Sequence, residues 1–387
     1  MSVFYEVDNV PVHSVLLMRT REQALRYPTG TIRLALCERC GFVSNVAFDP
    51  SLHEYSGEYE ATQSYSPTFN KFNRELAQHL IDTYDLQGKT VIEIGCGHGE
   101  FLILLSELGS IKGVGFDPAF IDERIQHPAK ESITFVADFY SEKYADVHGD
   151  FIVCKMTLEH IFDTADFVKT VRGSIGDRIG TRVFFQVPNA SYVFRDVAFW
   201  DIYYEHCSYF SKLSLAHLFM SNGFAVNHLF TAYDDQYLMI EANAASDGKH
   251  INLPLESMLV EIFSDVDFFK GNIDEHLNQW RHTLDVMQRN GRKVVLWGSG
   301  SKAVALLSTL GVSDEIDYVV DINPNKHGTY MAGTGHEIVN PDFLQSYRPD
   351  DVVIMNPIYK EEIEADLLRM DLAPNILTVE VPLKKAR

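Results

Sequence analysis

Cysteine is scarce in this chain: there are five in 387 residues, and only Cys37 and Cys40 lie close together. A low, odd number argues against a disulfide framework and favours a reducing compartment. Residues 1–6 lack the basic and then apolar pattern of a signal peptide. No window approaches the ~18 consecutive apolar residues that a membrane helix needs. We therefore expect a cytoplasmic protein that does not insert into a membrane.

Positive charge is also scarce, with 33 Lys and Arg against 54 Asp and Glu and a net charge of −21. Such a chain is repelled by phosphate backbones and anionic lipid, so nucleic acid and membrane surfaces are not expected as general partners. A local basic pocket or helix terminus can still hold an anionic small molecule. We expect a small-molecule substrate and a monomer or homodimer.

The chain divides into three regions by composition and hydrophobic pattern. At ~150 residues per domain its length predicts two or three domains. Residues 1–75 are rich in turns and aromatics, residues 76–247 alternate apolar strands with amphipathic helices, and residues 242–252 are small and polar, as in a linker. From residue 248 onward a long helical pattern (255–287) precedes a second alternation of strands and helices, which predicts a second parallel sheet. The alternative is one larger α/β domain. The strands expected in this last region are residues 293–297, 318–321, 352–355 and 376–381, and the helices are 302–310 and 361–370.

A glycine-rich turn stands between a predicted strand and a predicted helix. Residues 89–94 are apolar and β-branched, as in a central parallel strand, and Gly95, Gly97 and Gly99 follow at once. Residues 101–108 then carry a helical apolar face. Glycines let the backbone bend sharply and let a ligand approach it, while the helix N-terminus offers free N–H groups. Strand, glycine turn and helix together form a nucleotide-type motif.

Acidic residues at the strand ends indicate which cofactor this turn holds. Glu93 stands two residues before Gly95, where it would repel the pyrophosphate of a dinucleotide but suits a positively charged α-amino group. Asp117 ends the second strand and can accept both ribose hydroxyls. Asp138 and Phe139 follow the third strand, where they can meet an adenine amino group and stack on its ring. The alternative is that Asp117 and Asp138 are ordinary turn residues.

This ordered set, with a fourth strand at residues 151–154, resembles the class I S-adenosylmethionine-dependent methyltransferases. The resemblance implies a Rossmann-like α/β sheet and S-adenosylmethionine as cofactor. A Ser- and aromatic-rich segment at residues 63–69 is similar to one that lines the cofactor site in the nucleotide-deoxysugar C-methyltransferases. The implied cofactor-binding residues are Gln63, Tyr65, Phe69, Glu93, Gly95, Cys96, Gly97, Gly99, Asp117, Pro118, Asp138, Phe139, Lys155, Thr157 and His160.

A cluster of aromatic and titratable residues, 199–211, follows a fifth strand (182–187) and a Pro-Asn turn. This position lies beyond a strand C-terminus, on the ligand side of an open sheet. His206 suits proton transfer near neutral pH, and Glu205 beside it can orient the ring. Tyr203 or Tyr204 can donate a hydrogen bond to a developing oxyanion. The alternative is an aromatic core with a satisfied histidine.

The run from Tyr204 to Ser211 resembles the signature of the nucleotide-deoxysugar C-methyltransferases, which methylate carbon 3 of a nucleotide-linked 4-keto-6-deoxysugar. Residues 297–302, 319–328 and 355–359 resemble the C-terminal Rossmann-like domain of that family, and residues 36–43 resemble half of its zinc module. The resemblance implies that His206 removes the carbon-3 proton with help from Glu205. It implies an N-terminal zinc-type, substrate-lining module (1–75), a methyltransferase core (76–247) and a C-terminal Rossmann-like domain (248–387). The implied substrate-binding residues are Asn189, Gly298, Ser299, Gly300, Ser301, Lys302, Asp321, Lys326, Asn356 and Tyr359.

The zinc module departs from that pattern. The family uses two Cys-x-x-Cys pairs, whereas this sequence has only Cys37 and Cys40, and a structural zinc needs four closed ligands. His13 could supply a third ligand, and no fourth is evident. Zinc at Cys37 and Cys40 therefore competes with a turn that packs without metal, and with a first pair lying before the present start.

Two other functions remain open. The second glycine turn, residues 298–301, would by itself indicate an NAD-dependent oxidoreductase, although it is shorter than the full dinucleotide motif. A methyltransferase could also act on a nitrogen or oxygen of another polar natural-product intermediate, because such an acceptor needs positioning more than a carbon base.

Overall fold

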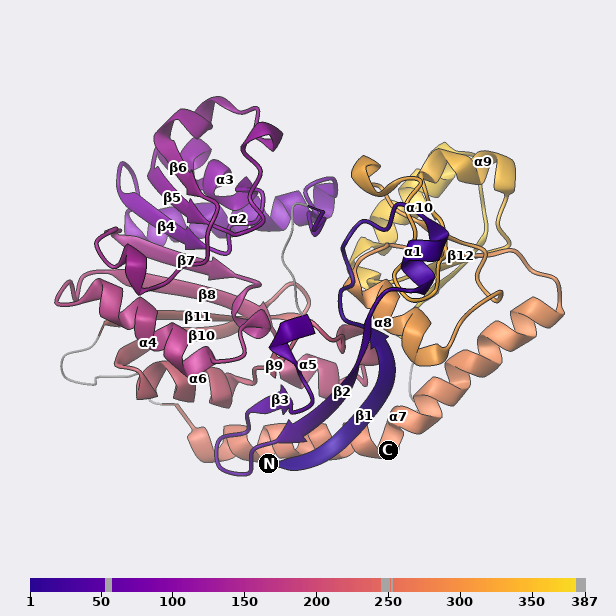
Figure 1. The fold of residues 1–387 in the computed structure, drawn as a ribbon, viewed down its shortest axis with the longest axis horizontal. Helices are drawn as coiled ribbons and strands as arrows, with labels where there is room; N and C mark the ends of the chain where they lie inside the picture. Colours follow the sequence, from indigo (N-terminus) through magenta and orange to yellow (C-terminus); the bar gives the residue numbers. More distant parts are fainter. Residues whose placement is uncertain (53–57, 245–250, 252, 381–387) are drawn as a thin grey trace.

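The computed structural model describes residues 1–52, 58–244, 251 and 253–380. Three sheets are arranged along the molecule, with a seven-stranded sheet at one end, a five-stranded sheet at the other and a four-stranded sheet between them (Figure 1). Most of the expected linker, residues 245–250 and 252, lies outside the described residues. Within the described part of the chain, every helix is too short or too polar to cross a bilayer.

The N-terminal region forms an antiparallel sheet that the sequence analysis missed. Its order is β1-β2-β3-β9, and its last strand comes from the aromatic cluster far along the chain. Bulges interrupt β1 at Val3/Tyr5 and at Val7/Val10, so the period-two pattern of a half-buried strand is broken in the sequence. The elements of this region are β1 (Ser2–Pro11), α1 (Arg21–Leu25), β2 (Thr29–Leu36), β3 (Val43–Asn45), η1 (Pro50–Leu52) and, later in the chain, β9 (Ser208–Tyr209).

The seven-stranded sheet has the order β10-β11-β8-β7-β4-β5-β6, and β11 alone runs antiparallel to its neighbours. The five parallel strands lie within two residues of their predicted positions, whereas β10 and β11 were not predicted. Helices between the strands cover the sheet. Its strands are β4 (Thr90–Ile94), β5 (Lys112–Phe116), β6 (Ile133–Val136), β7 (Phe151–Lys155), β8 (Arg182–Pro188), β10 (Phe224–Ala232) and β11 (Tyr237–Ala244). Its α-helices are α2 (Pro67–Tyr84), α3 (Glu100–Gly109), α4 (Thr164–Ile175), α5 (Ala190–Arg195) and α6 (Lys212–Ser221).

The five-stranded sheet is wholly parallel, in the order β14-β13-β12-β15-β16, which confirms the second parallel sheet. In each parallel region, the strands that follow the first one are added on one side of it and then on its other side. This first strand is the one that precedes the glycine turn. That strand is β4 in the first sheet and β12 in the second, and such switch points are where open α/β sheets bind ligands. The elements are β12 (Val294–Trp297), α8 (Ser301–Leu310), β13 (Tyr318–Val320), β14 (Ile338–Val339), α9 (Leu344–Tyr347), β15 (Asp351–Ile354), α10 (Lys360–Arg369) and β16 (Asn375–Thr378).

One long helix, α7 (Leu255–Arg289), passes beneath the molecule from one end to the other (Figure 1). Its buried side chains recur every three or four residues, as the sequence pattern predicts: Ile262, Val266, Phe269, Ile273, Leu277, Trp280, Leu284 and Met287. These side chains belong to one hydrophobic core that also contains residues of β1, β2, α5, β12 and α8. The shared core holds the sheets in a definite arrangement, so the two glycine turns keep a fixed relation.

Candidate active site

A cavity of about 840 Å³ reaches from the first glycine turn to the second. Its walls come from the ends of β4, β5 and β7, from the segment between α5 and β9, and from the end of β12. Each switch point therefore opens into the same space. A cavity of this size suits a drug-sized ligand together with part of a second one.

The first glycine turn leaves its backbone open to a ligand. Gly95 has a φ of +71°, and a Cβ atom on it would lie 2.0 Å from Thr157 Oγ1. Gly97 has a φ of +53° and donates its N–H to Asp117 Oδ2 at 2.8 Å. Gly99 does not line the cavity; it begins α3 with a φ of +80°. No residue with a Cβ atom fits at position 95 unless Thr157 moves.

The acid before the turn, Glu93, is buried and has an oxygen that can accept a hydrogen bond from a ligand. Glu93 is 3% exposed, and in the described part of the chain its Oε2 has no hydrogen-bond partner. Burial raises the pKa of Glu93, and burial lowers the pKa of the neighbouring Lys155. The Lys155 ammonium donates to Asn73 at 2.7 Å and lies 3.5 Å from the centre of the Phe101 ring. A buried carboxylate without a partner suits the cationic amino group of a ligand, as the sequence predicts.

The next two strand ends carry the other predicted acids. Asp117 Oδ1 accepts the N–H of Ala119 at 2.8 Å. Asp138 accepts hydrogen bonds from Tyr144 at 2.6 Å and Lys143 at 2.9 Å, which lower its pKa to about 2. Phe139 is 60% exposed although it lines the cavity, so its ring offers a flat apolar face to a planar group. The remaining predicted cofactor residues also line the cavity: Gln63, Tyr65, Phe69, Cys96, Pro118, Thr157 and His160.

His206 lies in the middle of the cavity wall. It is 2% exposed, its ring centroid lies 4.0 Å from that of Tyr203, and its buried Nδ1 has no hydrogen-bond partner within the described ranges. Burial holds the pKa of His206 well below its usual range, so the ring is neutral and can accept a proton. His160, expected beside the cofactor, lies against His206 with 4.9 Å between ring centroids.

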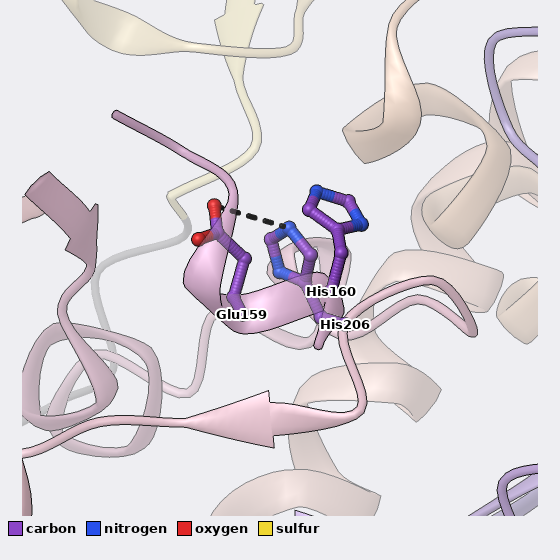
Figure 2. Close-up of side chains that lie close together, drawn as sticks. All are labelled: Glu159, His160 and His206. Atoms are coloured by element: carbon purple, nitrogen blue, oxygen red, sulfur yellow. Dashed lines mark ion pairs between the residues drawn. The ribbon is translucent and has the colours of Figure 1, made fainter. Parts of the chain in front are cut away.

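The acid beside His206 is Glu159, which the sequence analysis did not single out. Its Oε1 lies 4.0 Å from His206 Nε2 (Figure 2). Glu159 belongs to a short 3₁₀ turn, η5 (Leu158–His160), directly after β7. The signal that could have identified it is its position: an acid just beyond the C-terminus of a parallel strand faces the ligand side.

Glu205, predicted to assist His206, directs its carboxylate to other residues. The Glu205 carboxylate accepts hydrogen bonds from His13 Nδ1 at 3.1 Å, from the Ser14 N–H at 3.0 Å and from the Ser14 hydroxyl. Burial opposes the charge of this carboxylate, but the bonds from His13 and Ser14 leave its pKa below the usual range. Glu205 therefore ties the aromatic cluster to the chain that follows β1.

Of the two tyrosines, only Tyr203 lines the cavity. The Tyr204 hydroxyl accepts the N–H of Asp49 at 2.8 Å, and its ring occupies the space next to Gly30 of β2. A Cβ atom on Gly30 would lie 2.3 Å from that ring. Tyr204, predicted as an alternative to Tyr203, thus packs between the four-stranded sheet and the aromatic cluster and does not line the cavity.

The second glycine turn forms the far arm of the cavity. Lys302 donates to Asp201 at 2.7 Å and to Gln236 at 3.0 Å, two residues that the sequence analysis missed. Asn189, predicted to bind substrate, instead caps α5 and donates to the Asp235 carbonyl away from the cavity. The other predicted substrate residues do line the cavity: Gly298, Ser299, Gly300, Ser301, Lys302, Asp321, Lys326, Asn356 and Tyr359.

The residues expected to hold zinc do not form a closed site. Cys37 and Cys40 lie in the turn between β2 and β3, where the Gly41 N–H donates to the Cys37 carbonyl at 2.9 Å. His13 lies beyond the opposite end of the β1–β2 ribbon, because Ser2 pairs with Leu36 and Pro11 with Thr29. In the described part of the chain, neither thiol belongs to a group of three or more possible ligands. Two thiols do not satisfy a structural zinc ion, and the idea that His13 completes the site is wrong.

We accordingly expect that Cys37→Ser/Cys40→Ser leaves the fold intact. The two side chains are partly exposed, so the free energy of unfolding should change by less than about 1 kcal/mol. Denaturant unfolding of both proteins, before and after treatment with a chelator, measures this change. One zinc ion per chain by elemental analysis, with a fall in stability on chelation, would contradict the expectation.

The fold and the site define a class I S-adenosylmethionine-dependent methyltransferase. The strand order, the lone antiparallel strand β11, the glycine turn after β4, the acid near the end of β4 and the acid after β5 are the features of that class. Two family models match the chain: a methyltransferase domain over residues 68–229 and a C-methyltransferase C-terminal domain over residues 257–382. The second glycine turn, residues 298–301, lies within the second match.

The curated relatives agree with this class. The chain is 25% identical over 347 residues to the C-methyltransferase NovU of Streptomyces niveus, covering 85% of this chain and 81% of that protein. It is 34% identical over 119 residues to the tRNA U34 carboxymethyltransferase of Campylobacter hominis, covering 28% and 38%. A magnesium protoporphyrin IX methyltransferase from Synechocystis, solved with S-adenosylhomocysteine, gives a TM-score of 0.36 at 17% identity over 46% of this chain and 84% of that one.

Replacement of Asp117 by alanine is expected to weaken S-adenosylmethionine binding about 10–100-fold. The change removes the acceptor that shapes the turn at Gly97, and the acceptor expected for the ribose hydroxyls; hydrogen bonds to a charged group contribute about 1.5–3 kcal/mol. Titration calorimetry gives the Kd. Asp122→Ala, a change at an exposed ion pair with Lys130, is the matched control, and equal affinity in both variants would refute the assignment.

Proposed function

We propose that this enzyme transfers a methyl group to carbon 3 of a nucleotide-linked 4-keto-6-deoxysugar, with His206 as the base. The observation that carries the proposal is a buried, neutral histidine in the wall of a cavity that joins two nucleotide-type turns. Nitrogen and oxygen acceptors need positioning, whereas a carbon acceptor needs a base that removes a proton. The similarity to NovU over most of both chains supports carbon as the methylated atom.

The proposal assigns each arm of the cavity to one reactant. The first glycine turn, Glu93, Asp117 and Phe139 would hold S-adenosylmethionine, because together they offer acceptors for an amino group and for ribose, and a face for adenine. The second arm, with Lys302 and the start of α8, would hold the nucleotide part of the sugar. In the proposed division into three domains, 1–75, 76–247 and 248–387, the first glycine turn belongs to the second domain and Lys302 to the third.

The residues between the two arms would perform the proton transfer. The ketone acidifies the hydrogen on carbon 3, and His206 takes it. The Tyr203 hydroxyl donates a hydrogen bond to the enolate oxygen; burial keeps the pKa of Tyr203 well above its usual range, so the hydroxyl stays protonated. S-adenosylmethionine held around the first glycine turn would supply an electrophilic methyl group for this carbon. Glu205, held by His13 and Ser14, fixes the segment that carries both side chains.

The test is hydrogen exchange at carbon 3. The protein is mixed in deuterated water with thymidine-diphospho-4-keto-6-deoxysugar and S-adenosylhomocysteine, and the carbon-3 proton is followed by NMR. Loss of the signal at a rate proportional to enzyme concentration supports the proposal. A signal that persists in protein shown by calorimetry to bind S-adenosylhomocysteine would overturn it and favour N- or O-methylation of another polar acceptor.

A further inference from the structure

Glu159 is a fully buried acid that no contact in the structure explains. Its side chain lines the cavity, and neither Oε1 nor Oε2 has a hydrogen-bond partner among the residues that the structure describes. Burying a carboxyl group without a partner is costly, so such a group points to a role in the site. Its backbone carbonyl accepts the Cys207 thiol, which places η5 directly against the segment that carries His206.

The carboxyl group of Glu159 is directed at the imidazole of His206 (Figure 2). The 4.0 Å between Oε1 and Nε2 exceeds a hydrogen bond by about 1 Å, a looseness that catalytic pairs often show before substrate binds. The other nearby acids form hydrogen bonds with other residues: Glu205 with His13 and Ser14, and Asp201 with Lys302. Glu159 is therefore the acid that can act on His206.

We propose that Glu159 is the positioning residue of the proton transfer: its carboxylate holds the Nε2–H of His206 and leaves Nδ1 free to take the substrate proton. The inference rests on the proposed function, and it assigns to Glu159 the role that the sequence analysis gave to Glu205. Among the described residues Nδ1 has no hydrogen-bond partner, as this tautomer requires, and it is buried, so the substrate must bind directly against the ring to reach it. A carboxylate on the far nitrogen fixes the tautomer and stabilises the imidazolium that forms.

The transfer balances in one step. The bond between carbon 3 and its hydrogen breaks, the electron pair remains on carbon as the enolate, and the proton forms a bond to Nδ1. The positive charge on His206 is then offset by the negative charge on Glu159. After the product leaves, the proton on Nδ1 passes to water and restores the starting state.

This role predicts a pH dependence. Burial raises the pKa of Glu159 to about 8, so the carboxylate forms as the pH rises through that value. The titratable groups around it are His206, His160, Tyr203, Tyr237, Cys154 and Cys207. Burial lowers the pKa of both histidines, and it raises the pKa of both tyrosines and both thiols. Glu159 is thus the group of this set that ionises between about pH 7 and 9.

The experiment measures the carbon-3 exchange rate from pH 6 to 9.5 in the wild type, Glu159→Gln, Glu159→Asp and, as a surface control, Glu131→Gln. We expect the wild-type rate to rise through about pH 8. Glu159→Gln should be slower by about 100-fold at pH 9 and lose the rise, because a neutral amide cannot stabilise the imidazolium. Glu159→Asp should recover part of the rate together with the rise. Unchanged rate and profile in Glu159→Gln would overturn the inference.

Folding and the proposed function are checked separately. Because the folded pKa of Glu159 is raised, its stabilising contribution is present at pH 4.5 and lost as the pH rises through about 8. Glu159→Gln should therefore melt at the same temperature as the wild type near pH 5 and at a higher one at pH 9.

If the wild type itself shows no exchange, the proposed function fails, and ¹⁵N NMR of the His206 ring decides the inference alone. At pH 9 the wild type should carry its proton on Nε2, and an identical tautomer ratio in Glu159→Gln would refute the assignment.

Discussion

Replacement of His206 by alanine is expected to slow methyl transfer by about 10²–10⁴-fold, the usual contribution of a general base. The other groups that face this part of the cavity are poor substitutes. Burial keeps Tyr203 protonated, and Glu159 is protonated below about pH 8. The rate should be measured as S-adenosylhomocysteine formed in a single turnover, with the deoxysugar nucleotide as acceptor, so that product release does not obscure the chemical step.

Binding of S-adenosylmethionine separates this effect from a failure to fold. Apart from His160, the residues expected to hold the cofactor lie in the arm of the cavity around the first glycine turn, so the Kd of His206→Ala should remain within about threefold of the wild type, which is less than 1 kcal/mol. His217→Ala, on the exposed side of α6, is the control that removes an imidazole from the same region. A His206→Ala enzyme with the wild-type single-turnover rate would exclude the histidine as the base.

Of the variants described, Glu205→Ala is expected to lose the most stability. Its free energy of unfolding should fall by about 3–5 kcal/mol, the usual result of removing one member of a buried charged network. Glu205→Ala would leave the buried His13 imidazole and the Ser14 N–H without the acceptor they now share. It would also release the tie between the cluster at His206 and the chain beyond β1. Guanidinium unfolding followed by tryptophan fluorescence measures the change in free energy.

An exposed ion pair provides the comparison. Glu6 of β1 bonds to Arg33 of β2 at the surface, so Glu6→Ala removes a carboxylate from the same sheet and should change the stability little. Glu205→Gln should fall between the two, because the amide oxygen still accepts one hydrogen bond. Equal unfolding midpoints for Glu205→Ala and Glu6→Ala would show that the buried network does not hold the N-terminal sheet to the site.

Features carried by contiguous residues were predictable. Each glycine turn stands next to its strand and its helix in the chain, so the local pattern determines the turn, the helix start and the acids at the strand ends. The cavity arm around Gly95, Glu93 and Asp117 was predicted in this way, and so were β4 to β8 of the first sheet and every strand of the second parallel sheet except β14. The buried stripe of α7 follows from its three- and four-residue spacing.

The orientation of neighbouring residues in an irregular segment was not predictable. Tyr203, Tyr204, Glu205 and His206 are adjacent in sequence, yet Tyr203 and His206 face the cavity, Tyr204 packs on Gly30 and Glu205 reaches His13. No periodic pattern assigns sides in such a segment, because its backbone repeats neither every two nor every 3.6 residues. The packing of β1 and β2 against it decides which way each side chain points.

The sequence by itself determined a methyltransferase sheet, a cofactor turn with its acids, and a second α/β unit, because each depends on residues close together in the chain. Only the tertiary structure decided that both glycine turns open into one cavity, since the core shared by β1, α5, α7 and α8 sets their relation. It likewise decided that Glu159, rather than Glu205, lies beside His206. Such pairings join side chains from distant segments, and their geometry comes into being only when the sheets pack.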